Sequence, residues 1–175
     1  MTSGAAESAT GRVAATLRGK EPWLVLALLV TALDLWSKHA VFASMSVHER
    51  HWVWGQWFGL TPVFNSGVMW GAFPQLGDVL PWARIVAAIV VLFMLAHTAA
   101  DARSMLLALA LVLGGALGNI YDGFVHDSVR DFLLVDLGIR FFDPFPVFNV
   151  ADSAICIGVG LLALGLLFER RTAEA

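Results

Sequence analysis

Four long apolar runs constrain this chain more than any other feature of its sequence. A helix needs about 20 apolar residues to cross a bilayer core about 30 Å thick. In lipid every backbone N–H and C=O group must be hydrogen-bonded within the protein, and runs without alternation of polar residues favour helices over barrel strands. We therefore expect an all-α integral membrane protein with four transmembrane helices, over residues 23–42, 85–100, 105–120 and 153–168.

Composition agrees with membrane insertion and disfavours other classes. Hydrophobic residues make up 58% of the 175 residues, charged residues only 14%, and the mean hydropathy is +0.74. Soluble domains carry about 25% charged residues. The net charge of −3 argues against a nucleic-acid partner, because nucleic-acid binding needs a basic face on the protein. Cys156 is the only cysteine, so no intrachain disulfide can form, and we expect it to be a packing residue.

The placement of Lys and Arg predicts the orientation in the membrane. One side carries Arg103 in a short loop and five more in the two tails, namely Arg12, Arg18, Lys20, Arg170 and Arg171. The other side carries Arg50, Arg84, Arg130 and Arg140, spread over two longer loops. The positive-inside rule then puts the tails 1–22 and 169–175 in the cytoplasm and the loops 43–81 and 122–148 outside, around a membrane domain of residues 23–168.

Charges inside the first apolar run bear on whether it is retained. The basic residues before it resemble the start of a signal peptide. Asp34 and Lys38 lie within the run, which favours a retained working helix. They are four residues apart and so share one helix face. A charge at the bilayer centre costs about 2.5–3.5 kcal/mol on insertion scales, so we expect the two residues to be paired or functional.

The two outer loops are rich in aromatic residues. Residues 52–58 and 61–65 are strand-like stretches separated by glycine, and the first of them holds three tryptophans. Phenylalanines gather between residues 141 and 148. Such residues favour the membrane surface. These aromatic residues either form a docking surface for a substrate at the level of the lipid or simply anchor the loops in the membrane surface.

Acidic residues gather between the third and fourth apolar runs, at Asp122, Asp127, Asp131, Asp136, Asp143 and Asp152. An Asn-x-x-Asp pattern occurs twice there, and each pair shares one helix face. In the second pair, Asn149 is a good N-cap for the last helix, with Asp152 at its N3 position. The helix dipole at that position favours an ionised carboxyl group, so we expect Asp152 to be ionised.

Paired carboxyl groups can carry out peptide hydrolysis. One deprotonates water and the other protonates the carbonyl oxygen or the leaving amine, and two carboxyls that share a site do not ionise together easily. Asp152 could be one member. Spacing alone leaves Asp122, Asp127 and Asp131 open as the other, and it also leaves open that these residues form a merely solvated acidic loop.

Four stretches of the chain together resemble the lipoprotein signal peptidase (signal peptidase II) family. They occur in the family's order, with similar separations, over most of the chain after Lys20. They are Asp-Leu-Trp-Ser-Lys at 34–38, Asn-Ser-Gly-Val-Met-Trp at 65–70, Gly-Asn-Ile-Tyr-Asp at 118–122 with Val-Arg-Asp-Phe at 129–132, and Phe-Asn-Val-Ala-Asp-Ser at 148–153.

The resemblance implies a specific activity and site. The family removes signal peptides from prolipoproteins by cleaving before a cysteine that bears a diacylglyceryl group. It uses an aspartyl pair, with no metal and no cofactor. By motif, the catalytic pair is Asp131 and Asp152. The residues that support the pair or hold the substrate are Asp34, Lys38, Asn65, Asn119, Asp122 and Asn149.

The resemblance also implies a fold, a location and partners. The family fold has four transmembrane helices and a small extramembrane β-cradle, with the active site at the outer face of the bacterial inner membrane. Expected partners are diacylglyceryl-modified prolipoproteins, membrane lipid and cyclic peptide inhibitors of the globomycin type. We expect a monomer.

The sequence departs from the family pattern at two positions. The Asn-x-x-Asp motif is usually followed by Arg, where this chain has Gly123, and Phe is more common where Trp70 stands. We hypothesise that Arg130 supplies the missing charge from another position of the backbone.

Two other functions remain open on the sequence. Asp34, Lys38 and the outer carboxylates could form the path of a small proton or cation transporter. The chain could also be an inactive relative that only binds lipoprotein precursors. A metal site at residues 48–51, His-Glu-Arg-His, is disfavoured because it lacks the His-Glu-x-x-His spacing that places two ligands one helical turn apart.

Overall fold

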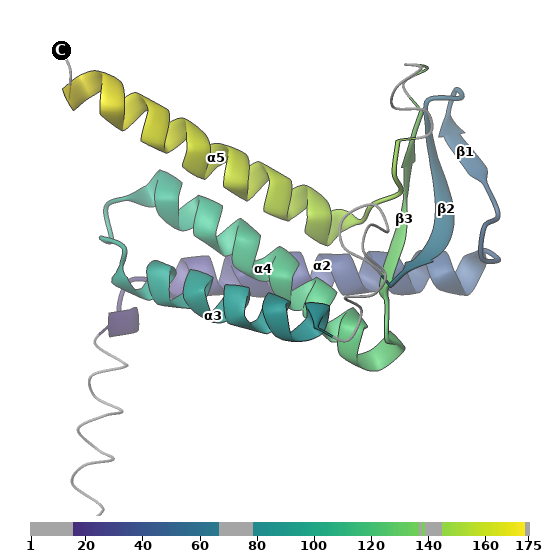
Figure 1. The fold of residues 1–175 in the computed structure, drawn as a ribbon, viewed down its shortest axis with the longest axis horizontal. Helices are drawn as coiled ribbons and strands as arrows, with labels where there is room; N and C mark the ends of the chain where they lie inside the picture. The colour runs from purple at the N-terminus through teal and green to yellow at the C-terminus, as the bar shows by residue number, and fades with distance from the viewer. Residues whose placement is uncertain (1–15, 67–78, 137, 139–144, 174–175) are drawn as a thin grey trace, which may run out of the picture.

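The computed structural model describes residues 16–66, 79–136, 138 and 145–173. Four helices form the body of the molecule: α2 (Glu21–Ser44), α3 (Leu80–His97), α4 (Arg103–His126) and α5 (Val150–Ala173). A small sheet of β1 (His51–Trp54), β2 (Phe58–Asn65) and β3 (Val129–Val135) stands across one end of the helices (Figure 1). The start of α2 and the end of α5 lie at the opposite end.

All four helices are long and apolar enough to cross a membrane, which confirms the expected four-helix membrane protein with a small sheet. The helix bounds differ from the expected ones. In particular, α4 continues to His126, so Asp122 lies in this helix and does not begin an outer loop, as the expected range 122–148 had it. The expectation ended the helix where the apolar run ended, but the charge of Asp122 is neutralised within the fold by Arg130.

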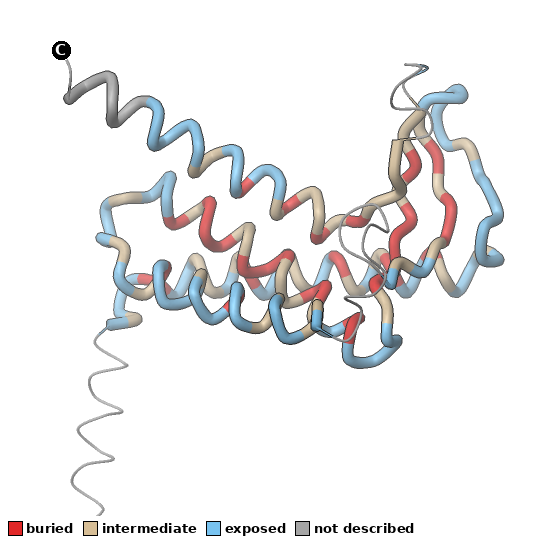
Figure 2. Tube along the Cα trace, in the orientation of Figure 1, coloured by how far each residue is buried: buried red, intermediate tan, exposed pale blue. Residues whose placement is uncertain are grey.

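The helix α4 is the centre of the bundle and packs against α2, α3 and α5. Buried residues run along α4, whereas the outer faces of the other helices are exposed (Figure 2). The exposed side chains on those faces are large and apolar, as in Leu28, Phe93 and Leu166. In a membrane protein such faces are the ones that meet lipid.

Glycines let α4 approach its neighbours closely. A Cβ atom on Gly114 would lie 2.5 Å from the Ala27 carbonyl oxygen, and one on Gly118 would overlap Oδ2 of Asp34. Small residues at helix contacts allow backbones to approach in this way in membrane proteins. The close approach at Gly118 places α4 directly beside the buried carboxylate of α2.

We expect Gly118→Ala to destabilise the protein by about 1–3 kcal/mol, because the new methyl group overpacks the contact with Asp34. Gly160→Ala is the matched control, since nothing lies within 4 Å of a Cβ atom there. Both substitutions gain the helix propensity of alanine, so their difference isolates the clash. Thermal unfolding of the two variants in detergent measures it. Equal stability of the two variants would contradict the packing argument.

The sheet is antiparallel, in the order β1-β2-β3. Its first two strands overlap the strand-like stretches expected at 52–58 and 61–65, but the chain turns around Gly55 (φ +57°) and β2 begins already at Phe58. The strand β3 was not expected. It pairs Asp131 with Val63 of β2. Phe148, just before α5, is also bonded to β3, since its N–H donates to the Leu133 carbonyl oxygen over 3.1 Å.

Candidate active site

Asp131 lies on β3, where the sheet meets the helix bundle, and its side chain is buried. Two amide groups donate to its carboxyl group: Nδ2 of Asn65 to Oδ2 over 3.0 Å, and Nδ2 of Asn149 to Oδ1 over 2.7 Å. Burial, and then the negative charge of Asp152, raise the pKa of Asp131 to about 7. At neutral pH this carboxyl group can therefore carry a proton.

Asp152 lies in the first turn of α5 and is held by a reciprocal cap. The Asp152 N–H donates to Oδ1 of Asn149 over 2.8 Å, and the Asn149 N–H donates to Oδ2 of Asp152 over 3.2 Å. This arrangement is the capping pattern that the sequence predicted. Nδ2 of Asn119 on α4 donates to Oδ1 of Asp152 over 2.8 Å. Both carboxylate oxygens of Asp152 therefore accept hydrogen bonds from fixed groups.

Asn149 joins the two carboxyl groups into one site. Its side-chain amide donates to Asp131, while its backbone N–H donates to Asp152. The residue is completely buried, so its amide plane is fixed by its partners. The strand β3 and the start of α5 thus present their carboxyl groups around a single asparagine.

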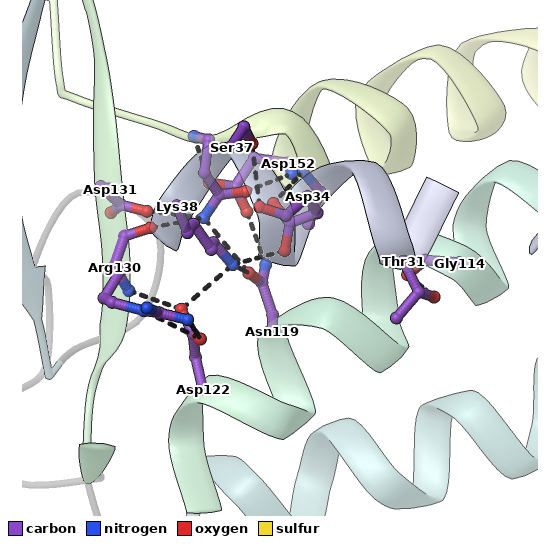
Figure 3. Close-up of polar contacts among 12 residues, drawn as sticks. Thr31, Asp34, Ser37, Lys38, Gly114, Asn119, Asp122, Arg130, Asp131 and Asp152 are labelled. Carbon is purple, nitrogen blue, oxygen red and sulfur yellow. Dashed lines mark hydrogen bonds and ion pairs between the residues drawn. The ribbon is translucent and has the colours of Figure 1, made fainter. Parts of the chain in front are cut away.

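A buried ion network lies beneath this pair (Figure 3). Nζ of Lys38 lies 2.7 Å from Oδ2 of Asp34 and 3.2 Å from Oδ2 of Asp122. Arg130 donates to Asp122 through Nη2 over 2.7 Å, through Nε over 3.1 Å and through its backbone N–H over 2.9 Å. Two cations and two carboxylates thus balance one another, as buried charges must.

Asn119 links the ion network to the carboxyl pair. Its Oδ1 accepts from Nζ of Lys38 over 3.0 Å and from Nδ2 of Asn149 over 3.2 Å. Because both partners are donors, the amide nitrogen of Asn119 must face Asp152, which accepts from it. Asp34 extends the network to the last helix, since its Oδ1 accepts from the Ala151 N–H over 2.9 Å.

The arrangement suits acid–base chemistry at a pair of carboxyl groups. One group, Asp131, is buried enough to hold a proton near neutral pH, and the other accepts hydrogen bonds on both oxygens. Within the described ranges, no group of three or more His, Cys, Asp or Glu side chains is placed to hold a metal ion.

A sequence model of the family described as "Signal peptidase (SPase) II" matches residues 26–168, which is most of the chain. The chain belongs to the signal peptidase II family. It is 38% identical over 166 residues to the lipoprotein signal peptidase of Pseudomonas syringae pv. tomato, covering 91% of this chain and 93% of that protein. It is 36% identical over 168 residues to the lipoprotein signal peptidase of Neisseria meningitidis, covering 93% and 98%.

Solved structures support the same family fold. One, titled as a bacterial membrane enzyme structure, superposes with a TM-score of 0.78 at 26% identity, over 86% of this chain and 90% of that one. A second structure of similar title gives a TM-score of 0.74 at 26% identity, over 84% and 93%. This signal peptidase II family member is therefore a multi-pass membrane peptidase.

The structure brings the eight predicted site residues together at one end of the bundle. Asn65 and Asn149 contact Asp131, Asn119 and Asn149 contact Asp152, and Lys38 joins Asp34 to Asp122 beneath them. Of the three candidate partners that spacing left open, Asp127 is exposed at the end of α4, in a left-handed conformation (φ 52°). Residues 67–70 of the second motif lie outside the described residues. The catalytic roles stay predictions.

Two arginines of this signal peptidase II family member contact α4 near its end. Arg130 contacts Asp122 directly, in agreement with the hypothesis that it supplies a charge at the Asn-x-x-Asp motif. Arg84 was counted among the loop cations but lies near the start of α3, against the backbone of Gly123. In the sequence Arg84 directly precedes the apolar run 85–100, which places it at the start of a helix.

Proposed function

We propose that this chain is an aspartyl endopeptidase that removes signal peptides from diacylglyceryl-modified prolipoproteins at the outer face of the bacterial inner membrane. The observation that carries the proposal is that one buried residue, Asn149, is hydrogen-bonded to the carboxyl groups of both Asp131 and Asp152. Relatives that match over nine-tenths of the chain or more are named lipoprotein signal peptidases, which supports the substrate class.

The two carboxyl groups take complementary parts in this proposal. Ionised Asp152 accepts a proton from water as the water oxygen attacks the scissile carbonyl carbon, and protonated Asp131 donates its proton to the carbonyl oxygen. When the tetrahedral intermediate collapses, the C–N bond breaks and Asp152 passes its proton to the leaving amine. Asp131 recovers a proton from the intermediate hydroxyl group, which restores the starting state.

The location at the outer face rests on two observations. The excess of Lys and Arg in the tails and in the loop before α4 favours a cytoplasmic position for that end. The sheet lies at the other end of the helices (Figure 1), and the carboxyl pair lies on β3 and in the first turn of α5. A diacylglyceryl group there can remain in lipid while the peptide bond reaches the site. Inhibitors of the globomycin type would bind at the same place, and a monomer holds every proposed site residue.

The pH dependence follows from the pKa of Asp131. Because this pKa is raised to about 7 and the proposed acid must be protonated, we expect kcat/KM to fall as pH rises above about 7. On the acid side, kcat/KM falls when the general base becomes protonated. The profile is measured with purified protein and a lipidated precursor peptide between pH 4 and 10. A rate that stays flat from pH 6 to 9 would contradict the assignment of Asp131 as acid.

Cleavage of a lipidated precursor by the purified protein tests the function itself. The proposal expects release of the signal peptide from the diacylglyceryl-modified precursor, with the unmodified precursor as the matched control. Saturable binding of the precursor without cleavage would overturn the enzyme in favour of a binder. Proton or cation flux through protein-containing liposomes, again without cleavage, would overturn it in favour of a transporter.

A further inference from the structure

The carboxyl pair carries a negative charge that the ion network beside it does not balance. Lys38 and Arg130 are matched by Asp34 and Asp122, with which they form ion pairs. A carboxyl pair that shares one proton adds one further negative charge. Among the described residues, neither Asp131 nor Asp152 forms an ion pair with a Lys or Arg side chain.

Arg84 is the cation placed to balance that charge. It is partly buried near the start of α3, and Nη1 of its guanidinium lies 3.5 Å from where a Cβ atom on Gly123 would be. It therefore rests on α4 at the residue after Asp122. No hydrogen bond or ion pair of Arg84 occurs among the described residues, so its charge acts through space. Its electrostatic interaction is largest with Asp152, followed by Asp131 and Asp122.

A methyl group at residue 123 would make ordinary van der Waals contact with Arg84, and a longer side chain would have to share that space with the guanidinium. The space above the Gly123 Cα atom is taken by Arg84 on one side and by Pro81, whose Cγ atom lies 3.7 Å from the built Cβ atom. A large side chain at residue 123 would displace the guanidinium from α4. Conversely, the backbone of Gly123 is not in the left-handed region, so a side chain can be placed there once Arg84 is shortened.

We propose that Arg84 is a positioning residue of the active site, which acts across Gly123 as the counter-ion of the carboxyl pair. The inference rests on the proposed aspartyl mechanism and deepens it. A positive charge near a carboxyl group favours its ionised form, and this helps the base more than the acid when the charge lies nearer the base. The other charged groups that face the pair are Asp34 and Lys38 from α2, Asp122 from α4 and Arg130 from β3.

The pH profile of cleavage tests this inference in three variants. Without the counter-ion, Arg84→Gln should move the acid limb of kcat/KM up by about one pH unit and lower the rate at pH 6 about tenfold. Arg84→Lys keeps the charge and should stay within about threefold of the wild type. The double variant Arg84→Ala with Gly123→Arg moves the guanidinium from α3 to α4, and should recover the wild-type profile.

Controls separate the electrostatic role from a structural one and from the proposed function. Arg103→Gln removes an exposed cation at the other end of α4 and should leave the pH profile unchanged. A merely structural Arg84 would lower the rate by the same factor at every pH. If Arg84→Gln folds and keeps the wild-type profile, the inference is overturned. If it does not fold, a folded double variant with a shifted acid limb overturns the inference.

Asp131→Asn in the same assay reports on the aspartyl mechanism itself. If Asp131→Asn still cleaves the precursor, the aspartyl mechanism is wrong. If Asp131→Asn is inactive while Arg84→Gln keeps the wild-type pH profile, only the inference about Arg84 is wrong.

Discussion

Asp131→Asn and Asp152→Asn are each expected to abolish cleavage of a lipidated precursor, with a loss of at least about 10²- to 10⁴-fold, the range that general acid–base groups contribute. Asparagine keeps the shape of the side chain and can still hydrogen-bond to Asn149, but it neither accepts nor delivers the transferred proton. The protein should therefore remain inserted and folded. Because the two groups act as one unit, the double variant should be no slower than the single ones.

Asp127→Asn is the matched control for both substitutions. Asp127 lies near Asp131 in the sequence but is exposed at the end of α4, and asparagine tolerates its left-handed conformation well. We expect wild-type cleavage from this variant. Cleavage at the wild-type rate by both Asp131→Asn and Asp152→Asn would end the proposed mechanism.

Lys38→Met is expected to destabilise the fold by about 3–5 kcal/mol, the range for removing one partner of a buried ion pair. The Lys38 side chain is completely buried and its ammonium group contacts Asp34, Asp122 and Asn119. Methionine fills a similar volume, so the loss comes from the two carboxylates left without their shared cation. Chemical or thermal unfolding in detergent measures it, and cleavage should fall because Asn119 loses a donor.

Two further variants make this measurement specific to the ion network. Arg103→Met removes an exposed cation on α4 and should leave stability almost unchanged. Asp34→Asn combined with Lys38→Met removes one carboxylate along with the cation, and should lose less stability than the two single changes added together. If Lys38→Met proves as stable as Arg103→Met, Lys38 does not hold the buried carboxylates.

Much of the helical fold could be predicted from the sequence, because hydropathy is a property of each segment by itself. The ends of the helices and the third strand could not. The helix α4 continues through Asp122, whose charge is neutralised by Arg130 eight residues later. No local sequence pattern predicts this ion pair. In β3 the residues Arg130 and Asp131 are both buried. Two adjacent charged residues are typical of an exposed loop, so the sequence did not indicate a buried strand there.

The site residues could be predicted for a different reason. Their motifs resemble a family, whereas spacing alone left three aspartates as possible partners of Asp152. Contacts between side chains of different helices could not be predicted from the sequence. Nothing in the sequence places Arg84 against Gly123, because the two residues meet only when α3 packs on α4.

The hydrogen bond from the Ala151 N–H to Asp34 joins residues that are 117 positions apart. It has a consequence for biosynthesis. When the first helix enters the membrane, its aspartate and lysine have only each other, and the amide that completes their surroundings is translated near the end of the chain. The proposed site can therefore be complete only once α5 has been inserted beside α2.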